Sequence, residues 1–307
     1  MSVTDLAVAQ YARDHADNQD VLGRLVLSTV SELTVAHDTV AVHLNRYGLG
    51  EYLGGVPADS DIFRRVTKTI QSREDLGDGT FLNVLVRDVT HGNTNEIVRR
   101  VVAENVDPKG KRLAYTEVWD LTFDKEHGTL TTRRTPDWIP TAADDIVAGL
   151  GDEYQAKRGT LNGDGIRALI KKILVGSHAI PIHRGASFMP RQHMGATDAI
   201  QSLAREFPEV DLLVVPLPNG SSEVHGVSKA LGEDTDRAIT ALMDQANEIA
   251  KAGKARQNTL ATMGTELRRL KARTQVYQEL LETDLSELDT RLLLLDQAVG
   301  AAIVAAS

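Results

Sequence analysis

The most regular pattern of apolar positions lies in the last quarter of the chain, from about Asp234 to about Ala305. With Ile239 at position a of a heptad, 12 of the first 17 a and d positions are apolar, whereas the average hydrophobic content of 42% would give about seven. No proline follows Pro218 to interrupt a helix. The pattern predicts a long coiled-coil-type helical arm over residues 227–307. We expect its apolar positions to form an oligomerisation seam: Ile239, Leu242, Ile249, Leu260, Met263, Leu267, Leu270, Tyr277, Leu281, Leu285, Leu288, Leu292 and Leu295.

Two interruptions divide this seam. Gly253 and Arg256 break the apolar stripe within residues 251–256, where the arm could bend back as a hairpin of two helices. After Leu281 a four-residue stutter shifts the stripe, which continues through Leu285, Leu292 and Val299. Two interpretations stay open: a rod that reaches other subunits, or a hairpin that packs on the body of its own chain.

A second pattern, with a period of two, covers residues 81–134 and indicates strands. Four strands are predicted, over residues 81–89, 95–106, 112–123 and 129–134. The turn before the third strand contains Pro108 and Gly110, which suit a tight reversal, and residues 125–128 form the next turn. In the third strand the apolar residues share one face with Glu117, so we expect an antiparallel meander with one buried face. They are Leu113, Tyr115, Trp119, Leu121 and Phe123.

Other segments alternate between helix and strand signals. Helices are predicted over residues 37–47, 61–71, 142–158, 165–175 and 191–207, strands over residues 21–30 and 210–215, and a short hairpin over residues 179–190. The predicted fold is therefore α+β. It comprises a mixed body over residues 1–226, with an antiparallel meander and flanking helices, followed by the helical arm.

Composition excludes several kinds of chemistry. The chain of 307 residues has no cysteine, so disulfides, thiolate nucleophiles and cysteine-ligated metals are absent. Phosphate-binding glycine loops, zinc-protease histidine pairs and serine-hydrolase elbows are also missing from the sequence. We therefore predict a protein with no catalytic residues, no cofactor and no metal. It has no long apolar run and no basic-then-apolar leader, which predicts a cytoplasmic protein of a bacterial cell without a membrane partner.

Basic residues suggest an alternative function. Arginine pairs occur at 99–100 and 133–134 within the predicted sheet, and one member of each pair should face outward. Arg99, Arg100, Arg133 and Arg134 could contact nucleic-acid phosphates, although the net charge of −9 lacks the basic excess usual for such proteins. The competing interpretation is cross-strand ion pairing with Glu96, Glu104 and Glu117.

The hairpin over residues 179–190 carries a further cluster of basic residues. Arg184, Arg191 and His193, together with Lys171 and Lys172, form the second choice for an anion site. His183, Arg184 and His193 could alternatively belong to an unfamiliar catalytic site.

Four short stretches carry a resemblance. They are Val21–Val26 (VLGRLV), Asp61–Thr67 (DIFRRVT), Lys109–Thr116 (KGKRLAYT) and Phe188-Met189-Pro190 followed by His193. These stretches resemble an uncharacterised family of actinobacterial and bacteriophage proteins, a domain of unknown function, over most of the chain. The resemblance implies a phage or prophage setting and supplies no functional residues.

The leading hypothesis is a non-enzymatic protein-interaction protein that forms a homo-oligomer through its C-terminal helices and also binds another protein. It depends on the heptad seam and on the missing catalytic motifs. The alternative is a nucleic-acid-binding protein that uses the arginine-bearing sheet.

Overall fold

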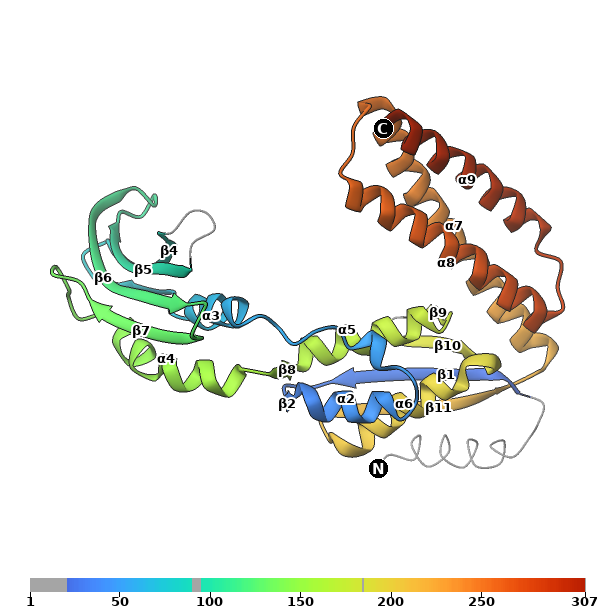
Figure 1. The fold of residues 1–307 in the computed structure, drawn as a ribbon, viewed down its shortest axis with the longest axis horizontal. Coiled ribbons are helices and arrows are strands. Elements are labelled where there is room, and N and C mark those ends of the chain that lie inside the picture. Colours follow the sequence, from blue (N-terminus) through green and yellow to red (C-terminus); the bar gives the residue numbers. More distant parts are fainter. Residues whose placement is uncertain (1–20, 90–94, 184, 307) are drawn as a thin grey trace. The chain divides into compact units, whose positions relative to one another are not determined.

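The computed structural model describes residues 21–89, 95–183 and 185–306, which fall into two units (Figure 1). Of the described residues, the first unit holds 21–33, 40–53 and 163–306, and the second holds 34–39 and 54–162. The predicted α+β class is confirmed, because both units combine helices with antiparallel strands. None of the helices in the described residues is long and apolar enough to cross a membrane.

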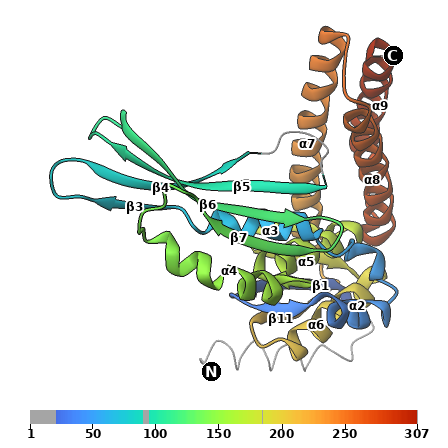
Figure 2. The same cartoon turned by 60° about the vertical axis from the view of Figure 1, so that its left-hand side comes forward.

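The second unit contains the predicted meander. Strands pair in chain order as β3 (Ser72–Asp75), β4 (Phe81–Asp88), β5 (Glu96–Val106), β6 (Arg112–Asp124) and β7 (Thr129–Arg134), all antiparallel. Figure 2 shows the curl of this sheet. The four predicted strands are confirmed, and β3 is an additional edge strand. Its sequence, SRED, is polar and mostly exposed, so it carries no apolar alternation.

Two helices cover one face of this sheet, α3 (Asp59–Lys68) and α4 (Ala143–Lys157). Helix α3 buries Ile62 and Val66, which lie one turn apart on its apolar face. The ring of Phe63 stacks on that of Phe123 at 5.3 Å between centroids, and Phe123 contacts Tyr154 of α4 at 5.7 Å. This aromatic stack joins both helices to the centre of the sheet.

We predicted that the third strand of the meander, now β6, buries a single face. This prediction is wrong for the first half of the strand. A β-bulge places Val118 as an extra residue, since Val101 pairs with Trp119 and Val102 pairs with Glu117. Such an insertion transfers all residues beyond it to the opposite face. Leu113 and Tyr115 are exposed, and so is Ala114 on the other face, so this end of β6 buries neither face, while the second half keeps its buried apolar residues, Leu121 and Phe123.

The first unit contains a second antiparallel sheet, in the order β11-β1-β10-β9. Strand β1 (Val21–Val30) lies between β11 (Val210–Pro218) and β10 (Ala186–Pro190), and β10 forms the predicted hairpin with β9 (Ile180–His183). Strand β11 continues through Pro216, where we expected it to end. A proline is tolerated there because β11 is an edge strand whose outer side needs no backbone donor.

Helices and short elements complete both units. Helices α2 (His37–Asn45), α5 (Gly163–Gly176) and α6 (Met194–Glu206) agree with the prediction within a few residues. Helix α6 lies against the face of the sheet that carries Arg24, whose Nη1 donates to Asp198 at 2.6 Å. The short 3-10 segments are η1 (Gly50–Tyr52) and η2 (Arg191–His193), and β2 (Thr34–Ala36) pairs with β8 (Thr160–Asn162) in the second unit.

The C-terminal region forms three helices that lie side by side (Figures 1 and 2). They are α7 (Ser221–Ala252), α8 (Gln257–Leu281) and α9 (Ser286–Ala306). The chain turns back at Gly253, whose left-handed φ of 60° ends α7 within residues 251–256. Glu282 adopts φ 49° and ends α8, so a second turn stands where we predicted a stutter. The interpretation of the arm as a continuous rod is therefore wrong. Helix α7 also runs across the predicted boundary between residues 226 and 227.

Candidate functional site

The heptad seam lies inside the chain's own three-helix bundle. Most of its residues are buried between α7, α8 and α9, together with Val299 and Ala302. Tyr277, Leu281 and Leu285 instead pack with Phe188 of the sheet, and Leu260 and Leu288 are partly buried. In this fold the seam therefore stabilises one chain and does not present a surface to a second one. The buried seam residues of the bundle are Ile239, Leu242, Ile249, Met263, Leu267, Leu270, Leu292 and Leu295.

Helix α9 has a second apolar face, opposite its buried stripe by helical spacing. Residues at helical spacing from 293 to 304 form it, and all of them are exposed. Val304 is 78% exposed, Leu293 55% and Leu294 53%. We define the outer face of α9 as Leu293, Leu294, Gln297, Gly300, Ala301 and Val304. Large exposed apolar side chains grouped on one helix mark an interaction surface more often than scattered ones do.

None of the residues of this outer face is charged. The last charged residue of the sequence is Asp296, and its carboxylate accepts a hydrogen bond from Lys271 Nζ of α8 at 2.8 Å. From Gln297 to the end the chain has only uncharged side chains. The sequence did contain a signal for this face. Four consecutive leucines, Leu292 to Leu295, place apolar side chains on more than one side of α9, whereas a bundle helix exposed on one side should be apolar on one stripe only.

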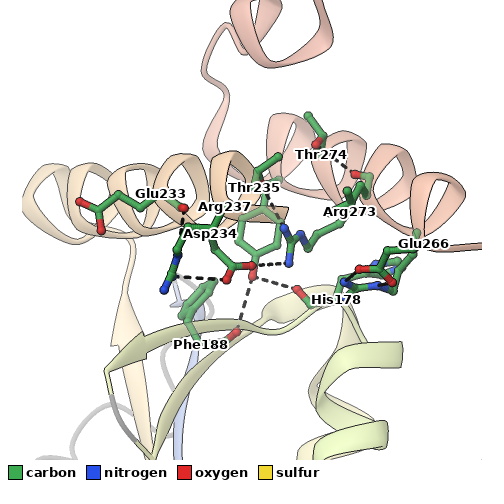
Figure 3. A network of polar contacts seen from close by, with 12 residues as sticks. His178, Phe188, Glu233, Asp234, Thr235, Arg237, Glu266, Arg273 and Thr274 are labelled. Atoms are coloured by element: carbon green, nitrogen blue, oxygen red, sulfur yellow. Dashed lines mark hydrogen bonds and ion pairs between the residues drawn. The ribbon is translucent and has the colours of Figure 1, made fainter. Parts of the chain in front are cut away.

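A buried polar network fixes the base of the bundle (Figure 3). Arg273 of α8 is only 2% exposed, and its Nη1 donates to Asp234 Oδ2 of α7 at 2.7 Å. Its Nη2 donates to Thr235 Oγ1 at 3.1 Å, while its Nε has no partner among the described residues. Tyr277 Oη donates to the carbonyl of His178 at 3.1 Å, and burial raises the pKa of this phenol. The network ties α8 both to α7 and to the sheet.

Two histidines stack beside this network. The rings of His178 and His193 meet edge to face with centroids 5.1 Å apart. Burial lowers the pKa of both, and for His178 the charges of His193, Arg269 and Arg273 lower it further. Arg269 is itself held by Glu266, with Nε 2.9 Å from Oε2. The Nδ1 of His178 is buried and has no hydrogen-bond partner among the described residues, so the observed interaction of the pair is the contact between its rings.

The basic residues predicted to cluster at the hairpin do not form one site in the structure. His193 pairs with His178, whereas His183 lies on β9 and lines a cavity with Lys171 of α5. Arg191 is exposed in η2, Lys172 is exposed on α5, and Arg184 lies outside the described residues. The described residues contain no group of three histidine, aspartate or glutamate side chains that could hold a metal.

The arginines of the meander contact carboxylates of their own sheet. Arg99 Nε donates to Asp88 at 2.8 Å, and Arg100 contacts both Glu117 at 2.7 Å and Asp120 at 2.8 Å. Arg133 Nη2 adds a second contact to Asp120 at 2.9 Å. Burial would raise the pKa of Asp120, but the hydrogen bonds from the two arginines lower it below its usual value. The competing interpretation, ion pairing within the sheet, therefore holds for these three arginines.

Arg134 is the exception, since its guanidinium lies over aromatic rings. It is 4.1 Å from the ring centroid of Trp138 and 5.3 Å from that of Trp119. Both indole nitrogens donate to Asp144, at 2.7 Å from Trp119 and 3.2 Å from Trp138. This cluster anchors α4 to the end of the sheet, so Arg134 also has a structural role.

Comparison with known proteins gives one match. Neither a search of curated proteins nor a search of solved structures finds a similar protein. The sequence model of a family of unknown function (DUF6744) matches residues 21–307, which is nearly the whole chain and agrees with the resemblance to an uncharacterised domain. The chain therefore belongs to this family of unknown function.

Proposed function

We propose that this protein is a non-enzymatic interaction protein that self-associates through the outer face of α9. The observation that carries this proposal is the row of exposed apolar side chains on a helix whose opposite face already completes the bundle. The heptad seam suggested the same function from a different surface. Because the seam is buried within one chain, the proposed contact moves to the face that remains outside.

Covering the large apolar side chains of this face would contribute favourably to such a contact. Covering apolar surface contributes about 25 cal/mol per Å², so each large side chain among Leu293, Leu294 and Val304 would contribute on the order of 1 kcal/mol when covered. Gly300 and Ala301 lie between them and carry little or no side chain, which allows a partner helix to approach closely. The face thus combines large apolar side chains with small residues between them.

A second copy suits this face better than a charged partner. In a two-fold interface the same surface meets itself, so like charges would lie opposite one another. The outer face of α9 has no charged residue and therefore avoids this repulsion, and it offers no charge to select a different partner. We infer an isologous pairing of α9 with α9 of a second copy.

Sedimentation velocity over a concentration series from about 1 to about 100 μM tests the proposal. We expect the weight-average sedimentation coefficient of the wild type to rise with concentration. Val304→Lys should abolish the rise, since it places two like charges in the contact. Val42→Lys is the matched control, because Val42 is an exposed valine of α2 in the same unit. A wild type that stays monomeric throughout would refute self-association, and equal effects of both variants would refute this surface.

A further inference from the structure

A cavity of about 520 Å³ lies between α5 and one end of the sheet in the first unit. It arises because neighbouring strands differ in length. Strand β1 pairs with β10 only as far as Leu27 opposite Ala186, but it pairs with β11 as far as Val30. The last three residues of β1, Ser28 to Val30, therefore lack a β10 neighbour and form one wall of the cavity. Helix α5 forms the opposite wall.

The walls combine an apolar surface with a positive one. Ile170, Leu174 and Val175 of α5 supply the apolar part. Arg167 and Lys171, one turn apart on the same helix, supply two cations. No aspartate or glutamate lines the cavity among the described residues, although the whole chain has 43 acidic and 34 basic residues. The local excess of positive charge runs against the composition of the protein.

The two cations differ in availability. Arg167 is engaged, because its Nη1 pairs with Asp164 and its Nη2 donates to the carbonyl of Val30. Arg167 therefore binds the last residue of β1, and these two contacts hold its guanidinium in place. Lys171 is exposed and has no ion-pair partner among the described residues. The imidazole of His183 and the hydroxyls of Ser28, Thr29 and Ser187 complete the polar part of the lining.

We propose that this cavity binds a small amphipathic carboxylate, with its carboxylate on Lys171 and its aliphatic tail against α5. A volume of 520 Å³ lies within the range of about 300–1,000 Å³ that is usual for ligand pockets. An apolar cavity with a few polar groups orients such a ligand by its charged end, and an ammonium–carboxylate hydrogen bond is stronger than a neutral one. The site is separate from the outer face of α9, since the two share no residue.

Octanoate is the probe, and isothermal titration calorimetry with the full chain is the measurement. We expect saturable binding by the wild type. Lys171→Gln should weaken it roughly tenfold, because a charge-assisted hydrogen bond is lost. Lys172→Gln is the matched control, since Lys172 is the neighbouring exposed lysine of α5 and does not line the cavity. Octanol, which has the same tail and no charge, should bind more weakly than octanoate.

A second variant locates the aliphatic tail. Ser28→Leu adds an apolar side chain to the strand wall of the cavity and should abolish octanoate binding, while circular dichroism checks that the protein remains folded. Equal affinities of the Lys171→Gln and Lys172→Gln variants would overturn the proposal. Binding that survives Ser28→Leu but disappears in Val304→Lys would place octanoate on α9 and would also overturn it.

Discussion

At the scale of single residues, Arg273 is the most deeply buried charged side chain in the described part of the fold. A guanidinium that is 2% exposed requires a compensating charge, and Asp234 provides it at 2.7 Å. Removing one partner of such a pair costs more than replacing the pair by apolar groups, because the remaining charge stays buried. Asp234 and Arg273 are therefore expected to respond differently to substitution.

Asp234→Asn should lower the free energy of unfolding by about 3 kcal/mol, since it leaves Arg273 without its counter-charge. Arg273→Met keeps the volume and removes the charge, so its cost should be smaller. Urea unfolding followed by far-ultraviolet circular dichroism measures both. Asp244→Asn, on the exposed side of α7, is the control and should change the free energy by less than about 0.5 kcal/mol. A neutral effect of Asp234→Asn would show that the pair does not stabilise the bundle.

The histidine pair predicts a pH dependence. Burial lowers the pKa of His178 and His193 in the folded chain below their ordinary value of about 6.5. The unfolded chain then binds more protons than the folded one below that pH, so stability is full above pH 6.5 and falls as the pH drops. Arg269 and Arg273 would add repulsion to a protonated His178, whereas Glu266 and Asp234 are already paired with these arginines.

Unfolding experiments between about pH 7.5 and pH 5.5 test this dependence. His193→Gln should flatten the loss of stability, and His225→Gln, at an exposed position of α7, should leave it unchanged. Circular dichroism or hydrogen exchange in α8 is the appropriate readout. Tryptophan fluorescence is not, because both tryptophans, Trp119 and Trp138, lie in the other unit. Equal pH profiles of the wild type and His193→Gln would contradict a role for the pair.

At the scale of elements, most of the fold follows from local patterns. The meander strands alternate apolar and polar residues, and Gly110 and Gly128 adopt the positive φ that their turns require. The features that the sequence did not predict depend on residues that are neighbours in space but not in the sequence. The bulge at Val118 changes which residues of β6 share a face, and no local pattern marks it. Pro216 fits within β11 only because that strand lies at an edge, which the sequence does not reveal.

The candidate sites, like the fold, could be predicted from the sequence only in part. A heptad identifies apolar stripes but cannot say whether the partner helix belongs to the same chain. Tyr277 and His178 lie 99 residues apart in the sequence, so no spacing rule connects them. The outer face of α9 was accessible to prediction, since four consecutive leucines exceed what one buried stripe needs.

The two turns of the bundle offer a paired test. Gly253 and Glu282 both adopt left-handed backbone, at φ 60° and φ 49°, but only glycine does so without steric cost. Glu282→Gly should raise the free energy of unfolding by about 0.5–1 kcal/mol, and Gly253→Ala should lower it by about 1 kcal/mol. Thermal unfolding followed by circular dichroism measures both. The same sign for the two variants would show that backbone strain does not limit these turns.

At the scale of the whole molecule, the proposed self-association should be insensitive to salt. An uncharged apolar contact is not screened, whereas phosphate binding by arginines weakens steeply as salt rises. Sedimentation at about 50 mM and about 500 mM sodium chloride should therefore give dimer affinities within roughly threefold of each other. Dissociation at high salt would point to a charged interface elsewhere on the chain.

Pulsed dipolar electron paramagnetic resonance tests the proposed α9 contact most directly. The chain has no cysteine, so Gln297→Cys places one nitroxide label at the middle of the outer face of α9. In an isologous pair with helix axes about 8–10 Å apart, two such labels should give a short, well-defined distance of about 20–30 Å. Gln245→Cys, on the exposed side of α7, should give a longer or broader distribution. Absence of dipolar coupling for label 297 at about 100 μM would contradict self-association through α9.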